Sequence, residues 1–136
     1  MIHLDTNAVI ALMGTRQPTV RQRFDAVRMS GVPIVLSAIA FHELMYGAAA
    51  SERQRENEQK LALFLAAGRI ETVPFTADDA REAGDIRAFL RRSGLPIGPF
   101  DMLIAAQARR VNATLVTANT REFSRVPALN VVDWAN

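Results

Sequence analysis

The chain of 136 residues has no cysteine, one lysine and two histidines. The absence of cysteine excludes a disulfide scaffold, a thiolate zinc site and a cysteine nucleophile. The two histidines, His3 and His42, do not form a nucleophile pair, and no glycine-rich phosphate loop is present. No apolar run approaches the roughly 20 residues that cross a bilayer. Because Met1 leads directly into a predicted strand, we expect no targeting segment, no membrane association and a cytoplasmic location.

What is present indicates a folded protein with a preference for anionic partners. Hydrophobic residues make up 49% of the chain, enough to bury a core, and we expect a single domain over residues 1–136. The net charge is only +2, yet every basic residue except Lys60 is an arginine. The planar guanidinium of arginine donates two parallel hydrogen bonds to a phosphate. Nucleic acid is therefore a natural partner.

The hydrophobic pattern predicts five short strands and about seven helices in alternation. Strands are predicted at 2–4, 33–36, 69–73, 113–117 and 130–132, and helices at 8–13, 18–30, 38–50, 52–67, 76–92, 100–111 and 120–123. Such alternation favours an α/β fold with a parallel sheet covered by helices on both faces. The strand at 69–73 is expected at an edge of the sheet, because Glu71 interrupts its apolar run.

Three carboxylates differ from the other acidic residues in their surroundings. The acids expected on solvated helix surfaces are Asp25, Glu52, Glu56, Glu58, Asp78, Asp79, Glu82 and Asp85. Asp5, in contrast, follows an apolar strand, while Glu43 and Asp101 lie within mostly apolar helices. Structural roles are open to each: Asp5 could cap a helix, Asp101 could favour the positive end of its helix, and Glu43 could pair with an arginine.

The positions of these three acids nevertheless favour a common site. Each follows a predicted strand or lies early in a helix, near the strand ends where a parallel sheet binds its ligands. Carboxylates that converge there repel one another unless a cation is present. Because the ligands would be oxygens alone, without cysteine or clustered histidine, the expected ion is Mg²⁺ or Mn²⁺.

Four blocks of sequence then resemble the PIN-domain family, and most closely its VapC toxins of type II toxin–antitoxin systems. The blocks are Leu4-Asp5-Thr6-Asn7; Ser37 with His42-Glu43-Leu44 and Gly47; Gly98-Pro99-Phe100-Asp101-Met102-Leu103-Ile104-Ala105-Ala106; and Val116-Thr117-Ala118-Asn119-Thr120-Arg121-Glu122-Phe123. They run nearly end to end, in the family's order and spacing. The resemblance implies a PIN-like three-layer sandwich and a metal-dependent endoribonuclease.

The resemblance also implies roles for individual residues. It places the metal-binding acids at Asp5, Glu43 and Asp101, and groups that contact water or phosphate at Thr6, Asn7 and Thr117. A fourth catalytic position, usually acidic in the family, falls at Asn119, which puts a second metal ion in doubt. Glu122, one turn later, is an alternative source of that charge. A metal-activated water would attack the phosphodiester and leave a 3′-hydroxyl and a 5′-phosphate.

Substrate and partners follow from the same resemblance. The expected substrate is RNA, with tRNA favoured, and the expected protein partner is a VapB-type antitoxin. A homodimer is also expected, since the family commonly dimerises and two-fold dimers are the commonest oligomers. The helix at 38–50 carries more apolar residues than one face needs, namely Phe41, Leu44, Met45 and Tyr46. These residues could bury against the core, a second copy or the antitoxin.

Two other readings are weighed against the nuclease. A phosphatase or receiver-like domain could use Asp5 as phospho-acceptor, but position 7 is Asn7 and no lysine follows the later strands. A catalytically weak RNA-binding module on the same fold is the second alternative. The retention of three metal-binding acids favours the nuclease over both.

Overall fold

The computed structural model describes residues 1–136 and shows one parallel sheet with the strand order β3-β2-β1-β4-β5. The strands are β1 (Ile2–Leu4), β2 (Ile34–Ser37), β3 (Glu71–Val73), β4 (Thr114–Val116) and β5 (Asn130–Val132). In the centre, Leu4 lies opposite Leu36 on one side and Val116 on the other. The five parallel strands confirm the predicted sheet.

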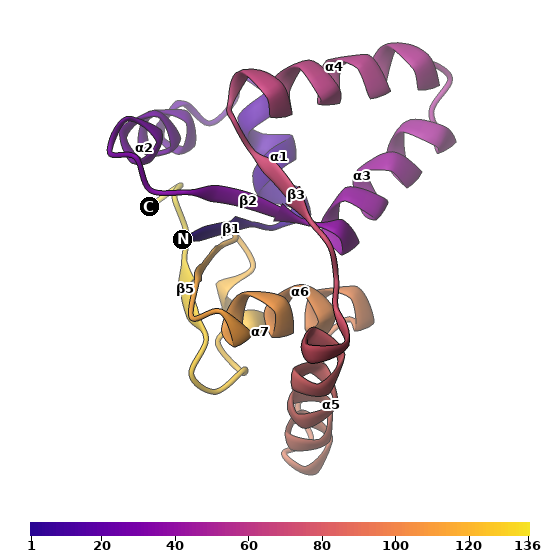
Figure 1. Ribbon diagram of the computed structural model, residues 1–136, viewed down its shortest axis with the longest axis vertical. Helices are drawn as coiled ribbons and strands as arrows, with labels where there is room; N and C mark the ends of the chain where they lie inside the picture. Colours follow the sequence, from indigo (N-terminus) through magenta and orange to yellow (C-terminus); the bar gives the residue numbers. More distant parts are fainter.

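Seven helices cover both faces of this sheet. They are α1 (Thr6–Met13), α2 (Pro18–Met29), α3 (Ala38–Ala50), α4 (Gln54–Ala67), α5 (Ala77–Arg92), α6 (Pro99–Arg110) and α7 (Thr120–Phe123). Figure 1 shows α1 to α4 above the sheet and α5 to α7 below it, which confirms the three-layer α/β sandwich. The chain changes faces when it passes from β3 to β4. The order of strands therefore reverses between β1 and β4, and open sheets bind ligands at such a switch point.

The buried core explains why the short strands hold together. All four residues of β2 are buried, as expected for a strand covered on both faces. The predicted edge strand is β3, where Glu71 and Thr72 are exposed. Near the C-terminus, Trp134 is buried and its ring packs edge-on against Phe24, with 6.4 Å between the ring centroids. No helix combines the length and the hydropathy that a bilayer-spanning segment requires.

The prediction that Asp79 lies on a solvated helix surface is wrong. Its side chain is 0% exposed, accepts hydrogen bonds from Thr76, and forms an ion pair with Arg110 on α6. Burial alone would raise the pKa of Asp79, but the hydrogen bonds from Arg110 and Thr76 outweigh it and hold that pKa below its usual value. The charged neighbours in sequence concealed this residue, since it alone of the first turn faces inward.

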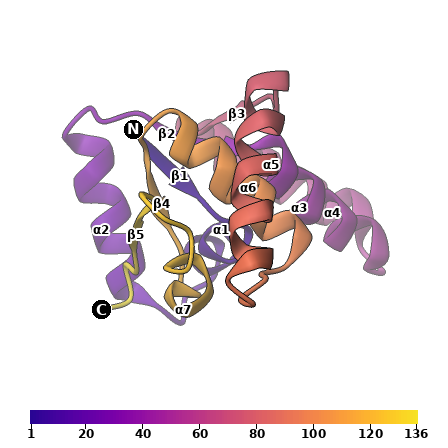
Figure 2. The ribbon, with the colours of Figure 1, turned by 90° about the horizontal axis from the view of Figure 1, so that it is seen from below.

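The Asp79–Arg110 pair also fixes how α5 lies on α6. A second ion pair, between Arg109 Nε and Glu82 Oε2 at 2.6 Å, runs parallel to it and leaves Glu82 half-buried. Both pairs join the first half of α5 to the end of α6, and the two helices cross where they pack on each other (Figure 2). Residues from the end of α5 and the start of α6, the turn that carries Asp101, line one hollow on the other side of this contact.

The capping box at the start of α5 should contribute measurably to stability. The Thr76 hydroxyl accepts from the Asp79 backbone N–H, and the Asp79 carboxylate accepts from the Thr76 backbone N–H. We expect Thr76→Ala to lower the free energy of unfolding by about 1 kcal/mol in urea denaturation. Ser93→Ala, which removes one exposed hydrogen bond at the other end of α5, is the control and should change it by less than about 0.5 kcal/mol. Equal losses in the two variants would contradict the role of the cap.

Candidate functional site

Asp5 stands where β1 passes into α1, at the carboxyl edge of the sheet. Its backbone N–H donates to the Val116 carbonyl at 3.1 Å, which carries the pairing with β4 one residue beyond the strand. Its Oδ1 accepts from the Ala8 backbone N–H at 2.7 Å, so Asp5 is the N-cap of α1. The side chain is only 5% exposed. The capping role that the sequence left open is thus real, and the same carboxylate occupies the switch point.

Thr117 supports Asp5 from the neighbouring strand end. It follows β4, is buried, and donates its backbone N–H to the Val132 carbonyl at 3.0 Å. Burial raises the pKa of Asp5, hydrogen bonds from Thr117 and Ala8 oppose that rise, and the charge of Glu43 adds to it. The net pKa of Asp5 is raised. The carboxylate is therefore oriented by two donors and disfavoured in its charged form.

Glu43 enters the site from the second turn of α3. Ser37 at the end of β2 caps that helix by accepting from the Ile39 backbone N–H at 3.0 Å. Glu43 Oε1 in turn accepts from the Thr6 hydroxyl at 2.7 Å. Thr6 thus links Glu43 to the first turn of α1, directly beside Asp5. Asn7, the other polar residue predicted there, is exposed.

Asp101 comes from the opposite layer, in the first turn of α6. Burial raises the pKa of its carboxyl to about 6, helped by the negative charges of Glu43, Asp5 and Glu122. These four side chains therefore act on one another electrostatically, although they come from four separate segments of the chain. We call Asp5, Glu43, Asp101 and Glu122 the acidic cluster. None of the four takes part in an ion pair with a basic side chain.

Asn119 and Glu122, the two residues considered for the fourth position, are hydrogen-bonded to each other at α7. Asn119 precedes α7, and its backbone N–H donates to Thr117 Oγ1 at 2.9 Å. Its side-chain Nδ2 donates to Glu122 Oε2 at 3.0 Å. Sequence reasoning missed one further acid, Asp133, whose charge also raises the pKa of Asp5. Asp133 directly follows β5, so the rule that sites lie at strand ends would have found it.

Comparison with known proteins identifies the family to which this site belongs. A model of the PIN domain matches residues 2–129. The chain belongs to the PIN-domain family. The tRNA(fMet)-specific endonuclease VapC of Shigella flexneri is 38% identical over 97% of this chain and 96% of its own length.

Two solved structures are similar to this PIN domain along nearly its whole length. In the crystal structure of VapBC2 from Rickettsia felis bound to a promoter DNA fragment, the matching chain is 35% identical, with a TM-score of 0.90 over 98% of this chain and 99% of that one. In the DNA-bound VapBC of Salmonella typhimurium, the matching chain is 34% identical, with a TM-score of 0.88 over 98% of this chain and 97% of that one. The likeness places this PIN domain in the VapC branch.

The donor chemistry of the acidic cluster suits a hard divalent cation. Its side chains offer carboxylate oxygens alone, and burial, together with their mutual repulsion, raises the pKa of Asp5 and Asp101. No three acidic or histidine side chains are spaced to hold a metal ion in this structure. Glu43 is instead bonded to Thr6, and Glu122 to Asn119. The residues fit such a cation in charge and donor type.

The two histidines contribute to other parts of the PIN domain, as their sequence positions suggested. His3 is buried within β1, and burial lowers its pKa to about 4, so it is neutral at physiological pH. His42 is exposed, and its ring packs on Phe100 with 5.4 Å between centroids. No hydrogen bond or ion pair joins either histidine to the acidic cluster.

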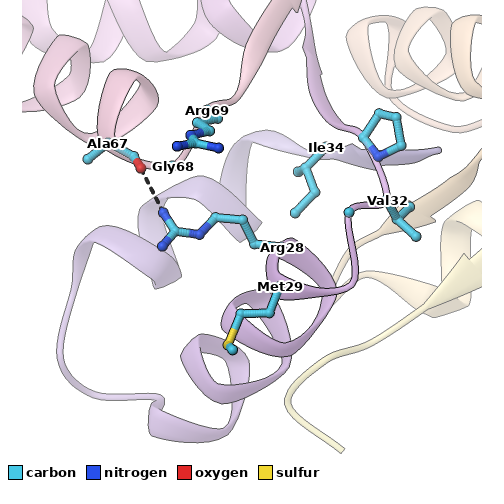
Figure 3. A pocket seen from close by; sticks show the side chains of 9 residues that line it. Arg28, Met29, Val32, Ile34, Ala67, Gly68 and Arg69 are labelled. Atoms are coloured by element: carbon cyan, nitrogen blue, oxygen red, sulfur yellow. Dashed lines mark hydrogen bonds between the residues drawn. The ribbon is translucent and has the colours of Figure 1, made fainter.

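A hollow of about 580 Å³ lies at the opposite, amino edge of the sheet. Figure 3 shows Arg28 and Arg69 at its wall, with the Arg28 guanidinium donating to the Ala67 carbonyl at 2.7 Å. Helices α2 and α4 both end there, so their negative dipole ends oppose an anion. This hollow contains no carboxylate and lies away from the strand ends that carry the acidic cluster, so we do not assign the site to it.

The raised pKa of Asp101, caused by burial and by the charges of the acidic cluster, predicts an unusual pH dependence of stability. Because the pKa of Asp101 is higher in the folded protein than in the unfolded chain, the folded state binds more protons between about pH 4 and 6. The metal-free protein therefore loses this part of its stability as pH rises through that window. Asp101→Asn should match the parent near pH 4.5 in urea denaturation with EDTA, and exceed it by about 1 kcal/mol at pH 7.5, after allowance for partial exposure.

The control is Asp85→Asn, which removes one charge from an exposed position on α5. A pH-dependent gain of equal size in both variants would show that net charge, and not the acidic cluster, is responsible.

Proposed function

We propose that this PIN domain is a metal-dependent endoribonuclease of the VapC type. The observation that carries the proposal is the acidic cluster, in which the charges of four carboxylates act on one another near the switch point of the sheet without a basic partner. A buried carboxylate with a structural role has a basic partner in this chain, as Asp79 has in Arg110. Relatives over the full length are named ribonucleases, which supports RNA as the substrate.

The chain's own residues define the chemistry at this edge. Asp5, Glu43 and Asp101 would hold Mg²⁺ or Mn²⁺, with Thr117 and the Ala8 N–H orienting Asp5, and Thr6 orienting Glu43. A bound divalent cation supplies Lewis acidity, which makes water a better nucleophile at neutral pH and offsets charge on the phosphate. Burial of Asp5 excludes bulk water from its carboxylate, so its charge is screened less.

Glu122 is the better candidate for the fourth carboxylate, and Asn119 for its support. An amide side chain brings no charge to a cation, whereas Glu122 already contributes to the raised pKa of Asp101. The hydrogen bond from Asn119 fixes one Glu122 oxygen and leaves the other free to accept. Asn119 is then a positioning residue that acts through Glu122.

Transfer RNA is the substrate that we favour. The relative from Shigella flexneri is named a tRNA(fMet)-specific endonuclease, and 38% identity over 97% of the chain leaves room for the same class of substrate. Sequence-specific recognition of RNA mostly uses unpaired loops, where splayed bases can be contacted individually. A tRNA presents such unpaired loops.

The proposal is tested by cleavage of a tRNA transcript. EDTA should stop cleavage, and Mg²⁺ or Mn²⁺ should restore it, because oxygen ligands select hard cations. Asp5→Asn and Asp101→Asn should each lower kcat by at least about 100-fold while the circular dichroism spectrum stays unchanged. Glu122→Gln should raise the Mg²⁺ concentration needed for half-maximal rate.

The matched control is again Asp85→Asn, which should cleave at the parent rate. Cleavage that persists in EDTA would contradict metal dependence. Binding of tRNA without any cleavage, by the parent and at all metal concentrations, would favour the non-catalytic RNA-binding alternative.

We also propose a VapB-type antitoxin as partner and a homodimer as the assembly. Of the four apolar residues predicted on α3, Phe41, Leu44 and Met45 pack partly against the core, whereas Tyr46 is 69% exposed. A hollow of about 330 Å³ lies between α1, α3 and α4, and Ile10 at its wall is 55% exposed. An amphipathic helix of the antitoxin could bury its apolar face there. The similar VapBC structures support this partner.

Light scattering distinguishes these assemblies. We expect the purified protein to have the mass of a dimer and to gain mass when the product of a neighbouring antitoxin gene is added. Ile10→Asp should weaken that complex at least about 10-fold, since it places a charge in an apolar contact. An unchanged affinity would place the antitoxin elsewhere, and a monomer at all concentrations would contradict the dimer.

A further inference from the structure

A second hollow, of about 430 Å³, lies between the end of α5 and the start of α6. Arg87 and Arg91 line it from α5, and Pro99 and Met102 line it from α6. We call it the α5–α6 groove. Pro99 and Met102 belong to the same first turn of α6 as Asp101, so the groove adjoins the turn that carries this acid. It is also within the size range of small-ligand sites.

The two arginines of this groove have no carboxylate partner. Arg87 and Arg91 are exposed and take part in no ion pair or side-chain hydrogen bond. At a spacing of four residues on one helix, two like charges repel each other. At the other end of the same helix pair, Arg109 and Arg110 both have carboxylate partners. The positive charge of the groove is therefore uncompensated.

Stabilisation of α5 by its helix dipole would explain only one of the two arginines. Cations in the last turn of a helix interact favourably with its dipole, which applies to Arg91. It does not apply to Arg87, which lies a turn earlier. The far wall is held by a third arginine, since Arg125 Nη1 donates to the Pro96 carbonyl at 3.0 Å. A concave surface with two unpaired guanidinium groups, those of Arg87 and Arg91, matches a phosphodiester in charge and geometry.

We propose that the α5–α6 groove is an accessory subsite for the RNA backbone, in which Arg87 and Arg91 bind a phosphate next to the scissile one. The inference rests on the proposed function, because it assumes an RNA strand at the acidic cluster. The apolar surfaces of Ile97 and Met102 in the same groove would contact the ribose and base of that nucleotide. The subsite contributes to binding and takes no part in bond cleavage.

The test compares two double variants of equal charge. Arg87→Gln with Arg91→Gln removes the subsite, while Arg55→Gln with Arg69→Gln removes two exposed arginines that likewise have no polar partner and lie outside the groove. We expect the first pair to raise KM for a tRNA transcript by about 10-fold with kcat unchanged, and to lower the slope of log KM against log salt by about 1 to 2. The second pair should leave both quantities near the parent values.

A conservative pair separates charge from structure. Arg87→Lys with Arg91→Lys keeps both charges, so the salt slope should return to the parent value. Equal KM and equal slope in the two glutamine pairs would overturn the subsite, and so would a fall in kcat alone. A change of mass by light scattering in the groove variant would overturn it too, by showing a contact between copies. If the parent protein cleaves RNA, each of these results contradicts only the subsite. If the parent protein does not cleave RNA, the nuclease proposal itself is wrong.

Discussion

The burial of carboxylates that also repel one another is the constraint on which the site depends. A folded chain ordinarily gives a buried acid a basic partner, and Asp79 has Arg110. Asp5 and Glu43 have only hydroxyl and backbone donors, which orient a carboxylate without cancelling its charge, and Asp101 has no basic partner either. The stability lost there must be supplied by the core, and a bound cation would remove the deficit. Binding of a cation would therefore stabilise the folded protein, because it offsets the negative charge of these carboxylates.

The topology explains why this constraint can be met by strands of only three or four residues. Because all five strands run parallel, every strand ends at the same edge, and the reversal of order between β1 and β4 separates the helices that follow them. Asp5 and Thr117 stand in the gap so formed, held by the backbone hydrogen bonds that extend the sheet. Glu43 arrives from the upper layer and Asp101 from the lower. Neither layer alone would assemble the cluster.

The sequence predicted the elements more completely than the contacts between them. The helix at 38–50 was predicted with the bounds that it has, because Ser37 caps it and its composition changes sharply there. Charge patterning failed for Asp79, since a run of acids resembles a solvated surface whichever member turns inward. Asp133 directly follows β5, so its place at the carboxyl edge was predictable, but its effect on Asp5 depends on strand pairings that a linear reading does not reveal. Local rules predict local structure, whereas ion pairs and clusters between distant segments require the fold.

The packing of α5 on α6 is fixed at one end by ion pairs and leaves a hollow at the other end. Where α5 begins, Asp79 and Glu82 engage Arg110 and Arg109, and these ion pairs set the register of the two helices. That register places the end of α5 beside the first turn of α6. Basic side chains are thus neutralised at the end where the helices are joined and left free at the end that adjoins Asp101. Arginines at one end of the helix pair therefore hold the two helices together. Arginines at the other end place positive charge near an acidic site that must accept a polyanion.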